Sequence, residues 1–377
     1  MRDQNTLTSI CALMPYMPDT TPSQRYRVEQ WLPYLQSQGI SIDLRPFADD
    51  GLMRLLHKPG RRMAKAAAGA IRFASRASDV MATSRYDAVL IHRTASIAGP
   101  ALLERLIPLF RRPLIYDFDD AIFMLHTTEA NKRFGWLKFP GKTATICRLS
   151  AHVIVGNSYL AEYARRYNPR VTVIPSSVDT ERYSPPKMPR ANDRVVIGWM
   201  GSSTSQAHLE LFAPVLRALI ARRDVELRVV SDREPLLPGL PFTWRPWSAA
   251  TEVEELAQFD IGIMPMPDDP WARGKCAMKA LLYMSMGVAT VCSAVGTNRE
   301  VIAHGENGFL AATSEEWINQ LESLIDDRHL RERLAREGRR TIEAHYSMQR
   351  CAEQFAQVVR QSIARPHTAT NYDPSIS

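Results

Sequence analysis

Two lysines in the second half of the chain have the charge and the spacing to bind one anion. Lys275 and Lys279 are four residues apart, so they share a face of a helix that we expect to begin at Gly274. The next expected strand, 288–291, is followed by small residues at 293–296, which let backbone approach a ligand at the carboxyl edge of a sheet. This pattern predicts a diphosphate site. The alternative is that both lysines are solvated surface residues.

A glycine- and serine-rich segment is a second candidate for binding phosphate. Gly201, Ser202 and Ser203 follow a strand expected at 195–199 and precede a helix that opens near Gln206. Their backbone N–H groups therefore lie at the positive end of a helix, where phosphates bind. The segment itself contains no cation.

Acidic residues crowd the end of a strand expected at 113–117. Asp117, Asp119 and Asp120 lie within four residues, and such like charges raise at least one pKa unless a cation or hydrogen-bond donor compensates. We predict that Asp119 orients an acceptor hydroxyl or takes its proton. The alternatives are a divalent-ion site and an aspartate-rich helix N-terminus, and of these we predict no metal. His92, which ends another expected strand, is a second catalytic candidate.

The elements that must position these residues alternate between strand and helix. Short connections between them predict an α/β fold, in which each half is a parallel sheet with helices on both faces. The strands are expected at 10–14, 40–44, 86–92, 113–117, 153–155, 171–175, 195–199, 226–230, 261–264 and 288–291, and helices between the early strands at 23–38 and 100–110.

The chain is long enough for two domains, because 377 residues exceed what one hydrophobic core normally serves. The proline-rich stretch 185–189 interrupts the strand–helix pattern and predicts the boundary. We expect an N-terminal domain at 1–187, a C-terminal domain at 188–345 and a loose tail at 365–377.

The motifs between 274 and 310 occur together in one known family. They are a helix ending in Met284-Ser285-Met286-Gly287, a V-x-x-V strand, a Gly296-x-x-x-Glu300 loop and a Gly305-x-x-Gly308-Phe309-Leu310 turn. As a set they resemble the donor-binding half of the retaining, nucleotide-sugar-dependent glycosyltransferases of family 4. The resemblance implies a GT-B fold, with two doubly wound Rossmann-like domains facing across a cleft. It also implies that a C-terminal helix, here 346–364, completes the first domain.

The resemblance assigns roles to single residues. It places Gly296 and Glu300 in the donor site and gives Arg27 a contact with donor or acceptor anions. Relatives often carry a histidine near the position of Asp119, which supports a role for this residue at the acceptor side.

The chain departs from the family at two glutamates that are usually separated by seven residues. When the motif is aligned on Gly287, their positions hold Gly274 and Leu282. We therefore transfer no glutamate role to this chain.

The net charge of +7 indicates an anionic partner. A helix over 61–77 would align Arg61, Lys65, Arg72 and Arg76 in one stripe, and segment 132–139 interleaves cations with aromatics. Both patterns predict docking onto an anionic membrane surface. The alternative is a helix that packs its alanines on the sheet and shows its arginines to water. We expect no nucleic-acid partner, because no recognition motif accompanies the charge.

The sequence favours a cytoplasmic protein at the inner face of the membrane. Its five cysteines are scattered without C-x-x-C spacing, and no apolar run approaches the roughly 20 residues that span a bilayer. The N-terminal stretch also lacks the pattern of a signal peptide.

These features predict a retaining glycosyltransferase that needs no cofactor. It would move a sugar from a nucleotide-diphosphate donor to a lipid-linked or polysaccharide acceptor. The missing glutamates leave open a degenerate sugar-nucleotide-binding or scaffold protein, and a nucleotide-sugar epimerase of similar architecture is the other alternative.

Overall fold

The computed structural model describes residues 7–57, 60–97, 99–124, 139, 141–186 and 194–364. The chain divides into two compact units: unit 1 comprises 1–176 and 351–377, and unit 2 comprises 177–350. The first boundary therefore precedes the proline-rich stretch 185–189. Residues just after the boundary pack within unit 2, where Tyr183 donates a hydrogen bond from its hydroxyl to Glu252 at 2.6 Å.

Unit 1 contains a six-stranded parallel sheet in the order β2-β1-β3-β4-β5-β6. Its strands are β1 (Thr8–Met14), β2 (Ile40–Pro46), β3 (Ala88–His92), β4 (Leu114–Phe118), β5 (His152–Val155) and β6 (Val171–Val173). Its helices are α1 (Pro22–Arg27), η1 (Glu29–Trp31), α2 (Leu32–Ser37), α3 (Asp50–His57), α4 (Arg62–Ala82), η2 (Thr83–Arg85), η3 (Glu104–Phe110), α5 (Gly141–Leu149), α6 (Ser158–Arg165) and α14 (Met348–Ala364). Every residue of β3 and β4 is buried, as expected for strands covered on both faces.

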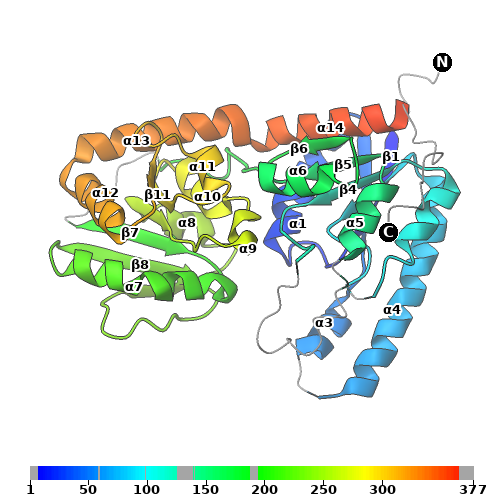
Figure 1. Cartoon of the computed structure of the whole chain (residues 1–377), viewed down its shortest axis with the longest axis horizontal. Coiled ribbons are helices and arrows are strands. Elements are labelled where there is room, and N and C mark those ends of the chain that lie inside the picture. Colours follow the sequence, from blue (N-terminus) through cyan, green and yellow to red (C-terminus); the bar gives the residue numbers. More distant parts are fainter. Residues whose placement is uncertain are drawn as a thin grey trace. The chain divides into compact units, whose positions relative to one another are not determined.

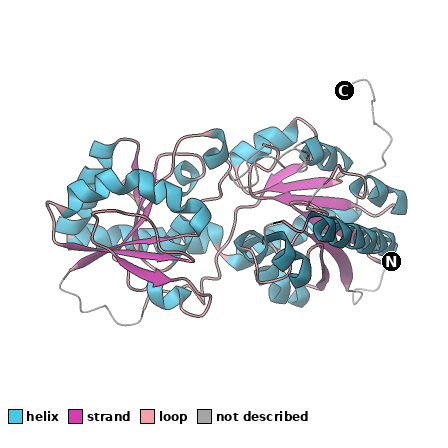
Figure 2. Cartoon of the chain, turned by 90° about the horizontal axis from the view of Figure 1, so that it is seen from below, coloured by secondary structure: helices cyan, strands magenta, loops and turns pink. Residues whose placement is uncertain are grey.

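Unit 2 contains a second six-stranded parallel sheet, in the order β12-β11-β10-β7-β8-β9. Its strands are β7 (Val195–Met200), β8 (Val225–Ser231), β9 (Thr243–Pro246), β10 (Ile261–Met264), β11 (Ala289–Ser293) and β12 (Phe309–Ala311). Its helices are η5 (Ser203–Ser205), α7 (Gln206–Ile220), α8 (Glu252–Leu256), α9 (Pro270–Arg273), α10 (Met278–Ser285), α11 (Asn298–Val301), α12 (Ser314–Asp326), α13 (Arg328–Thr341) and the π-helical turn η6 (Ile342–Tyr346). In each unit the sheet lies inside and helices cover it (Figures 1 and 2).

The structure changes two of the expected helices. The helix expected at 23–38 is interrupted at Val28, whose backbone is not helical (φ −135°), and continues as η1 and α2. The helix expected at 100–110 is the 3₁₀ helix η3, which contains Pro108. Two short strands, β9 and β12, were not expected from the sequence.

Helix α4, the long helix of unit 1 in Figure 1, turns a different face to solvent than its charge pattern suggested. Arg76 is buried and donates to the Met14 carbonyl at 3.0 Å, and Arg72 donates to the Phe47 carbonyl at 2.6 Å. The exposed large side chains are Met63, Ile71 and Met81, which are 85%, 69% and 67% exposed. The prediction of a solvent-facing cationic stripe is wrong for Arg72 and Arg76, because carbonyls near the ends of β1 and β2 bind these guanidinium groups. Segment 132–139, apart from residue 139, lies outside the described residues.

Within the described part of the chain, no helix is long and apolar enough to cross a membrane.

Tyr283 fixes helix α10 to the sheet of unit 2. Its buried ring lies against Gly262 of β10, where an added Cβ atom would come within 2.4 Å of the ring. Its hydroxyl accepts a hydrogen bond from the N–H of Met200, the last residue of β7, at 2.8 Å. This contact holds α10, which carries Lys279, next to the carboxyl end of β7.

The Gly262→Ala variant tests this packing. Because the new methyl group would overlap the Tyr283 ring, we expect the free energy of unfolding to fall by about 1–3 kcal/mol. Gly69→Ala is the matched control: an added Cβ at this position in α4 meets nothing within 4 Å, and removing a mid-helix glycine should stabilise by about 0.5–1 kcal/mol. Urea denaturation followed by circular dichroism measures both. A Gly262→Ala protein as stable as the wild type would show that the contact is loose.

Candidate functional site

The candidate residues of unit 1 gather at the carboxyl edge of its sheet. His92 is the last residue of β3 and pairs with Asp117 of the neighbouring strand β4. The chain runs from β1 to β2 on one side and places β3 on the other side of β1, so the strand order reverses between β1 and β3. Open α/β sheets bind ligands outside the carboxyl ends of the strands at such a switch point.

Asp117 is the buried centre of this group. Arg27 donates to its carboxylate from Nε at 3.1 Å and from Nη2 at 2.5 Å, and Nδ1 of His92 lies 2.7 Å from Oδ2. Burial raises the pKa of Asp117, but the charge of Arg27 and the hydrogen bonds from His92 and Arg27 outweigh it and hold the pKa at about 2. Asp117 is therefore ionised at neutral pH.

Arg27 serves this carboxylate rather than a ligand. The side chain is fully buried, and Nη1 donates to the carbonyl of Ile174 at 2.8 Å. This burial argues against the expected direct contact with a donor or acceptor anion. It gives Arg27 the role of holding Asp117.

Asp119 follows β4 directly and lies closer to the surface than Asp117. Its Oδ1 accepts a hydrogen bond from the Ser23 hydroxyl at 2.7 Å and lies 3.7 Å from Arg93, which also pairs with Asp120 at 2.9 Å. Burial opposes ionisation, but the charges of Arg93 and His92 lower the pKa of Asp119 below its usual value. The pKa values of Asp117 and Asp119 are thus lowered rather than raised, because Arg27 and Arg93 compensate the two carboxylates.

Sequence reasoning did not single out Ser23 as a site residue. Ser23 is separated from His92 and Asp119 by 69 and 96 positions, so no local motif reports it. Arg93 follows His92 directly and has a left-handed backbone (φ 59°), which is uncommon for a residue with a side chain and clusters at functional sites. Among the described residues, no group of three His, Cys, Asp or Glu side chains could hold a metal ion.

In unit 2 the two lysines lie close together, but the backbone between them is not the expected helix. Helix α10 begins at Met278, so Lys275 lies in the connection from α9 and not on the helix. Ala277 between them has a left-handed backbone (φ 53°), which ends the connection and starts the helix. The expected helix start at Gly274 is wrong for this reason: the four-residue spacing is kept, but the backbone between the lysines is not helical.

Aromatic rings accompany both lysines. Nζ of Lys275 lies 4.9 Å from the ring centre of Trp271, and Nζ of Lys279 lies 5.6 Å from that of Trp199. Burial, and then the charge of Lys275, lower the pKa of Lys279 to about 8. The two ammonium groups are therefore close enough to repel, and a bound anion would relieve that repulsion.

The loop after β11 packs against the lysine-bearing connection. An added Cβ at Gly296, which has a φ of 49°, would come within 2.9 Å of the Arg273 backbone, so only glycine fits here. The Thr297 hydroxyl donates to the carbonyl of Lys275 at 2.5 Å. Glu300 is exposed on the short helix α11. The loop that contains Gly296 is therefore in direct contact with the segment that contains Lys275.

Part of the expected phosphate loop is already engaged within the protein. The N–H of Gly201 donates to the Val230 carbonyl at 3.0 Å, and the N–H of Ser203 donates to the Asp232 carboxylate at 2.5 Å. The Ser203 hydroxyl also donates to Asp232, at 2.9 Å. A carboxylate on this loop disfavours phosphate at Ser203. Ser202, whose hydroxyl lies 2.7 Å from that of Thr204, is exposed.

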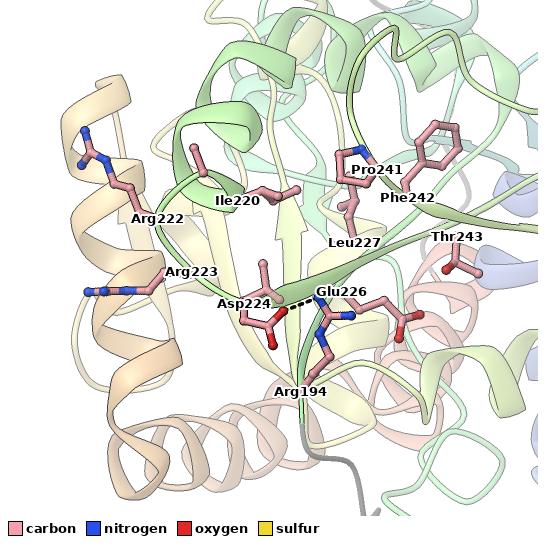
Figure 3. A pocket seen from close by; sticks show the side chains of 12 residues that line it. Arg194, Ile220, Arg222, Arg223, Asp224, Glu226, Leu227, Pro241, Phe242 and Thr243 are labelled. Atoms are coloured by element: carbon pink, nitrogen blue, oxygen red, sulfur yellow. Dashed lines mark hydrogen bonds and ion pairs between the residues drawn. The ribbon is translucent and has the colours of Figure 1, made fainter.

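The open pocket drawn in Figure 3 is not the donor site. It has a volume of about 550 Å³ and lies where β8 and β9 begin, with Arg194, Asp224 and Thr243 in its wall. Figure 3 shows Arg194 paired with Asp224 across it. This is the amino edge of the sheet, whereas open α/β sheets bind ligands at the carboxyl edge.

Comparison with known proteins agrees with the fold. Residues 194–327 match the family model described as Glycosyl transferases group 1. A comparison with curated protein sequences gave no match.

Several solved structures are similar to nearly the whole chain. Sucrose-phosphate synthase from Thermosynechococcus elongatus has a TM-score of 0.69 at 15% identity, covering 95% of this chain and 99% of that one. HepE of Anabaena, in complex with UDP and glucose, has a TM-score of 0.67 at 16% identity, covering 94% and 100%. A glycosyltransferase from Rickettsia africae has a TM-score of 0.66 at 12% identity, covering 96% and 100%.

These findings confirm the predicted glycosyltransferase with two Rossmann-like domains. Residues 194–327 are similar to the group 1 glycosyl transferases, and the chain has the fold of the GT-B glycosyltransferases.

Proposed function

We propose that this protein is a retaining glycosyltransferase that uses a nucleotide-diphosphate sugar and a lipid-linked or polysaccharide acceptor in glycan biosynthesis. The observation that carries the proposal is the pair Lys275 and Lys279, held beside the Gly296 loop within the group 1 domain. Glycosyl transfer needs cations that stabilise a leaving diphosphate, and this pair supplies two. Because HepE binds UDP-glucose, UDP-sugars are the first donors to test.

The proposal assigns donor binding to unit 2 and acceptor binding to unit 1. In unit 2, the proposed donor-binding residues Gly201 and Ser202 follow β7, and Gly296 and Glu300 follow β11, so they lie beyond the carboxyl ends of these strands. In unit 1, Asp119 orients the acceptor hydroxyl or accepts its proton, with His92 behind it. No cofactor is required in this scheme.

We also propose that unit 1 docks on an anionic membrane surface, through a different face than the charge pattern suggested. The outer face of α4 presents Met63, Ile71 and Met81, and exposed Arg61 stands at its start. The 3₁₀ helix η3, which packs beside α4, and the residues just before it add three further exposed leucines and an exposed arginine: Leu102, Leu106, Leu109 and Arg105. Apolar side chains flanked by cations suit the interface of an anionic bilayer.

Donor binding should depend on pH through Lys279. Its folded pKa of about 8 means that it is charged below pH 8 and neutral above, so affinity for a UDP-sugar should fall as pH rises through 8. Lys279→Met should weaken binding at pH 7 by roughly 1.5–3 kcal/mol, the range for a hydrogen bond to a charged group, and should flatten this pH dependence. Lys275→Ala should weaken binding within the same range.

Isothermal titration calorimetry from pH 7 to 9 measures these affinities, with Lys65→Met in unit 1 as the matched control. Unchanged affinity in both site variants, with the fold intact, would refute the lysine site.

Asp119→Asn tests the acceptor side. Asparagine keeps the size and removes the charge, so the rate of single-turnover transfer should drop by roughly 10²–10⁴-fold, the usual contribution of a positioned acid or base. Donor affinity should change little. Asp120→Asn, which alters a neighbouring carboxylate that also pairs with Arg93, is the control. If Asp119→Asn transfers normally but loses about 1 kcal/mol of stability, the residue only caps local structure.

The membrane proposal predicts weaker vesicle binding when Met63, Ile71 and Met81 are all replaced by glutamine. Burying one such side chain contributes about 1.5–3 kcal/mol, so the triple variant should bind phosphatidylglycerol-containing vesicles at least about tenfold more weakly. Replacing Leu211 and Leu236, two exposed leucines of unit 2, is the control. Vesicle flotation measures the binding of each protein. A wild-type protein that shows no preference for anionic over neutral vesicles at low salt would exclude this docking.

A further inference from the structure

Ser23 connects two charged parts of the unit 1 site. Its Oγ lies 2.9 Å from Nε2 of His92 and 2.7 Å from Oδ1 of Asp119. On the far side of the ring, Nδ1 of His92 lies 2.7 Å from Oδ2 of Asp117. Four side chains from α1, β3, β4 and the turn after β4 therefore form one chain of three hydrogen-bonding contacts.

Counting hydrogens shows that this chain of contacts has a place for an extra proton. Each of the three contacts needs one hydrogen. Asp117 is ionised beside Arg27, so the contact with His92 uses the ring's Nδ1–H. Ser23 has a single O–H and can supply one of its two contacts. The remaining hydrogen must sit on Nε2 of His92 or on Asp119. The arrangement thus accommodates one proton more than neutral His92 and ionised Asp119 carry.

Burial makes Ser23 the route for that proton. His92 has no exposed surface and Asp117 is 2% exposed, whereas Ser23 is half-buried and Asp119 is 9% exposed. The described contacts of the ring nitrogens are with Asp117 on one side and Ser23 on the other. Among the described contacts, the serine hydroxyl links the His92 ring to the Asp119 carboxylate.

We propose that Ser23 is a positioning residue that joins Asp119 to His92, so that the proton of the acceptor hydroxyl ends on His92. The inference rests on the proposed function of Asp119. As the acceptor oxygen bonds to the anomeric carbon, its O–H bond breaks and the proton joins the Asp119 carboxylate. Asp119 then protonates Oγ of Ser23 while the original Ser23 hydrogen moves to Nε2 of His92. The sugar–diphosphate bond breaks, and its electron pair leaves with the diphosphate.

The charges around His92 suit temporary storage of a proton. Asp117 accepts from Nδ1 and stabilises the imidazolium, while Arg27 balances the charge of Asp117. Among the described residues, the charged and titratable groups around the ring and its partners include Tyr16, Arg27, Arg93, Asp117, Asp119 and Asp120. After the product leaves, the proton passes back from His92 through Ser23 to Asp119 and then to solvent. His92 is then neutral again.

Nuclear magnetic resonance of the full chain with ¹⁵N-labelled histidine tests the proton chain without any transfer assay. The signals of His92 are identified by their loss in His92→Gln. Removing the hydroxyl in Ser23→Ala should lower the titration midpoint of His92 by about 1–2 pH units, since a hydrogen bond to the charged ring is lost. Ser23→Thr keeps the hydroxyl and should keep the midpoint. Ser9→Ala, which removes a serine-to-aspartate hydrogen bond elsewhere in unit 1, should not change it.

Single-turnover transfer by the same proteins tests the role in catalysis. Ser23→Ala should be slower by about tenfold or more, below the full effect of removing a positioned base, and Ser23→Thr should recover most of the rate. The wild-type rate should rise with pH over the range in which His92 loses its proton.

An unchanged His92 midpoint in Ser23→Ala overturns the proposal, and so does a full transfer rate in that variant. Failure of the proposed function looks different, because Asp119→Asn would then also transfer at the full rate.

Discussion

The buried ion pair between Arg27 and Asp117 is the interaction on which the unit 1 site depends. Removing one partner of such a pair leaves an uncompensated buried charge and costs about 3–5 kcal/mol. The pair ties α1 to β4, and a second bond from Arg27 to the Ile174 carbonyl reaches the residue after β6. Because Asp117 stays ionised, it fixes the orientation of the His92 ring. That orientation directs Nε2 to Ser23, and Ser23 in turn contacts Asp119.

Unit 2 places two like charges close together instead of pairing opposite ones. Its two lysines lie over the Trp271 and Trp199 rings, and Lys275 acts on Lys279 as a like charge that lowers its pKa. Aromatic faces attract cations only modestly, by about 0.5–2 kcal/mol, so they do not cancel this repulsion. A diphosphate would interact favourably with both ammonium groups and remove the repulsion between them. The carboxylates of the unit 1 site are thus paired with arginines of the same unit, whereas the proposed partner of the lysine pair is an anionic ligand.

The sequence predicted the sheets better than the contacts that complete the sites. Runs of buried apolar residues located ten of the twelve strands, and β9 and β12 escaped because they are short and β9 ends in a proline. Helix limits failed where a single backbone angle decided them, as at Val28 and Ala277. The exposed face of α4 was misjudged because its many alanines suit either environment, and because the carbonyls that bind Arg72 and Arg76 lie far away in sequence. Ser23 left no signal for the same reason.

Gly274 and Leu282 stand where the family that the sequence resembles usually has glutamates. These two positions affect the charge around the lysine pair. Leu282 is buried in α10, beside the tyrosine that fixes the helix to the sheet, and Gly274 is buried before Lys275. Carboxylates at these positions would provide negative charge near the lysines and hydrogen-bond acceptors for sugar or ribose hydroxyls. With leucine and glycine there, no carboxylate at these two positions offsets the positive charge of the lysine pair. Recognition of the donor should therefore rely more on its diphosphate and less on its hydroxyl groups than in relatives that keep both glutamates.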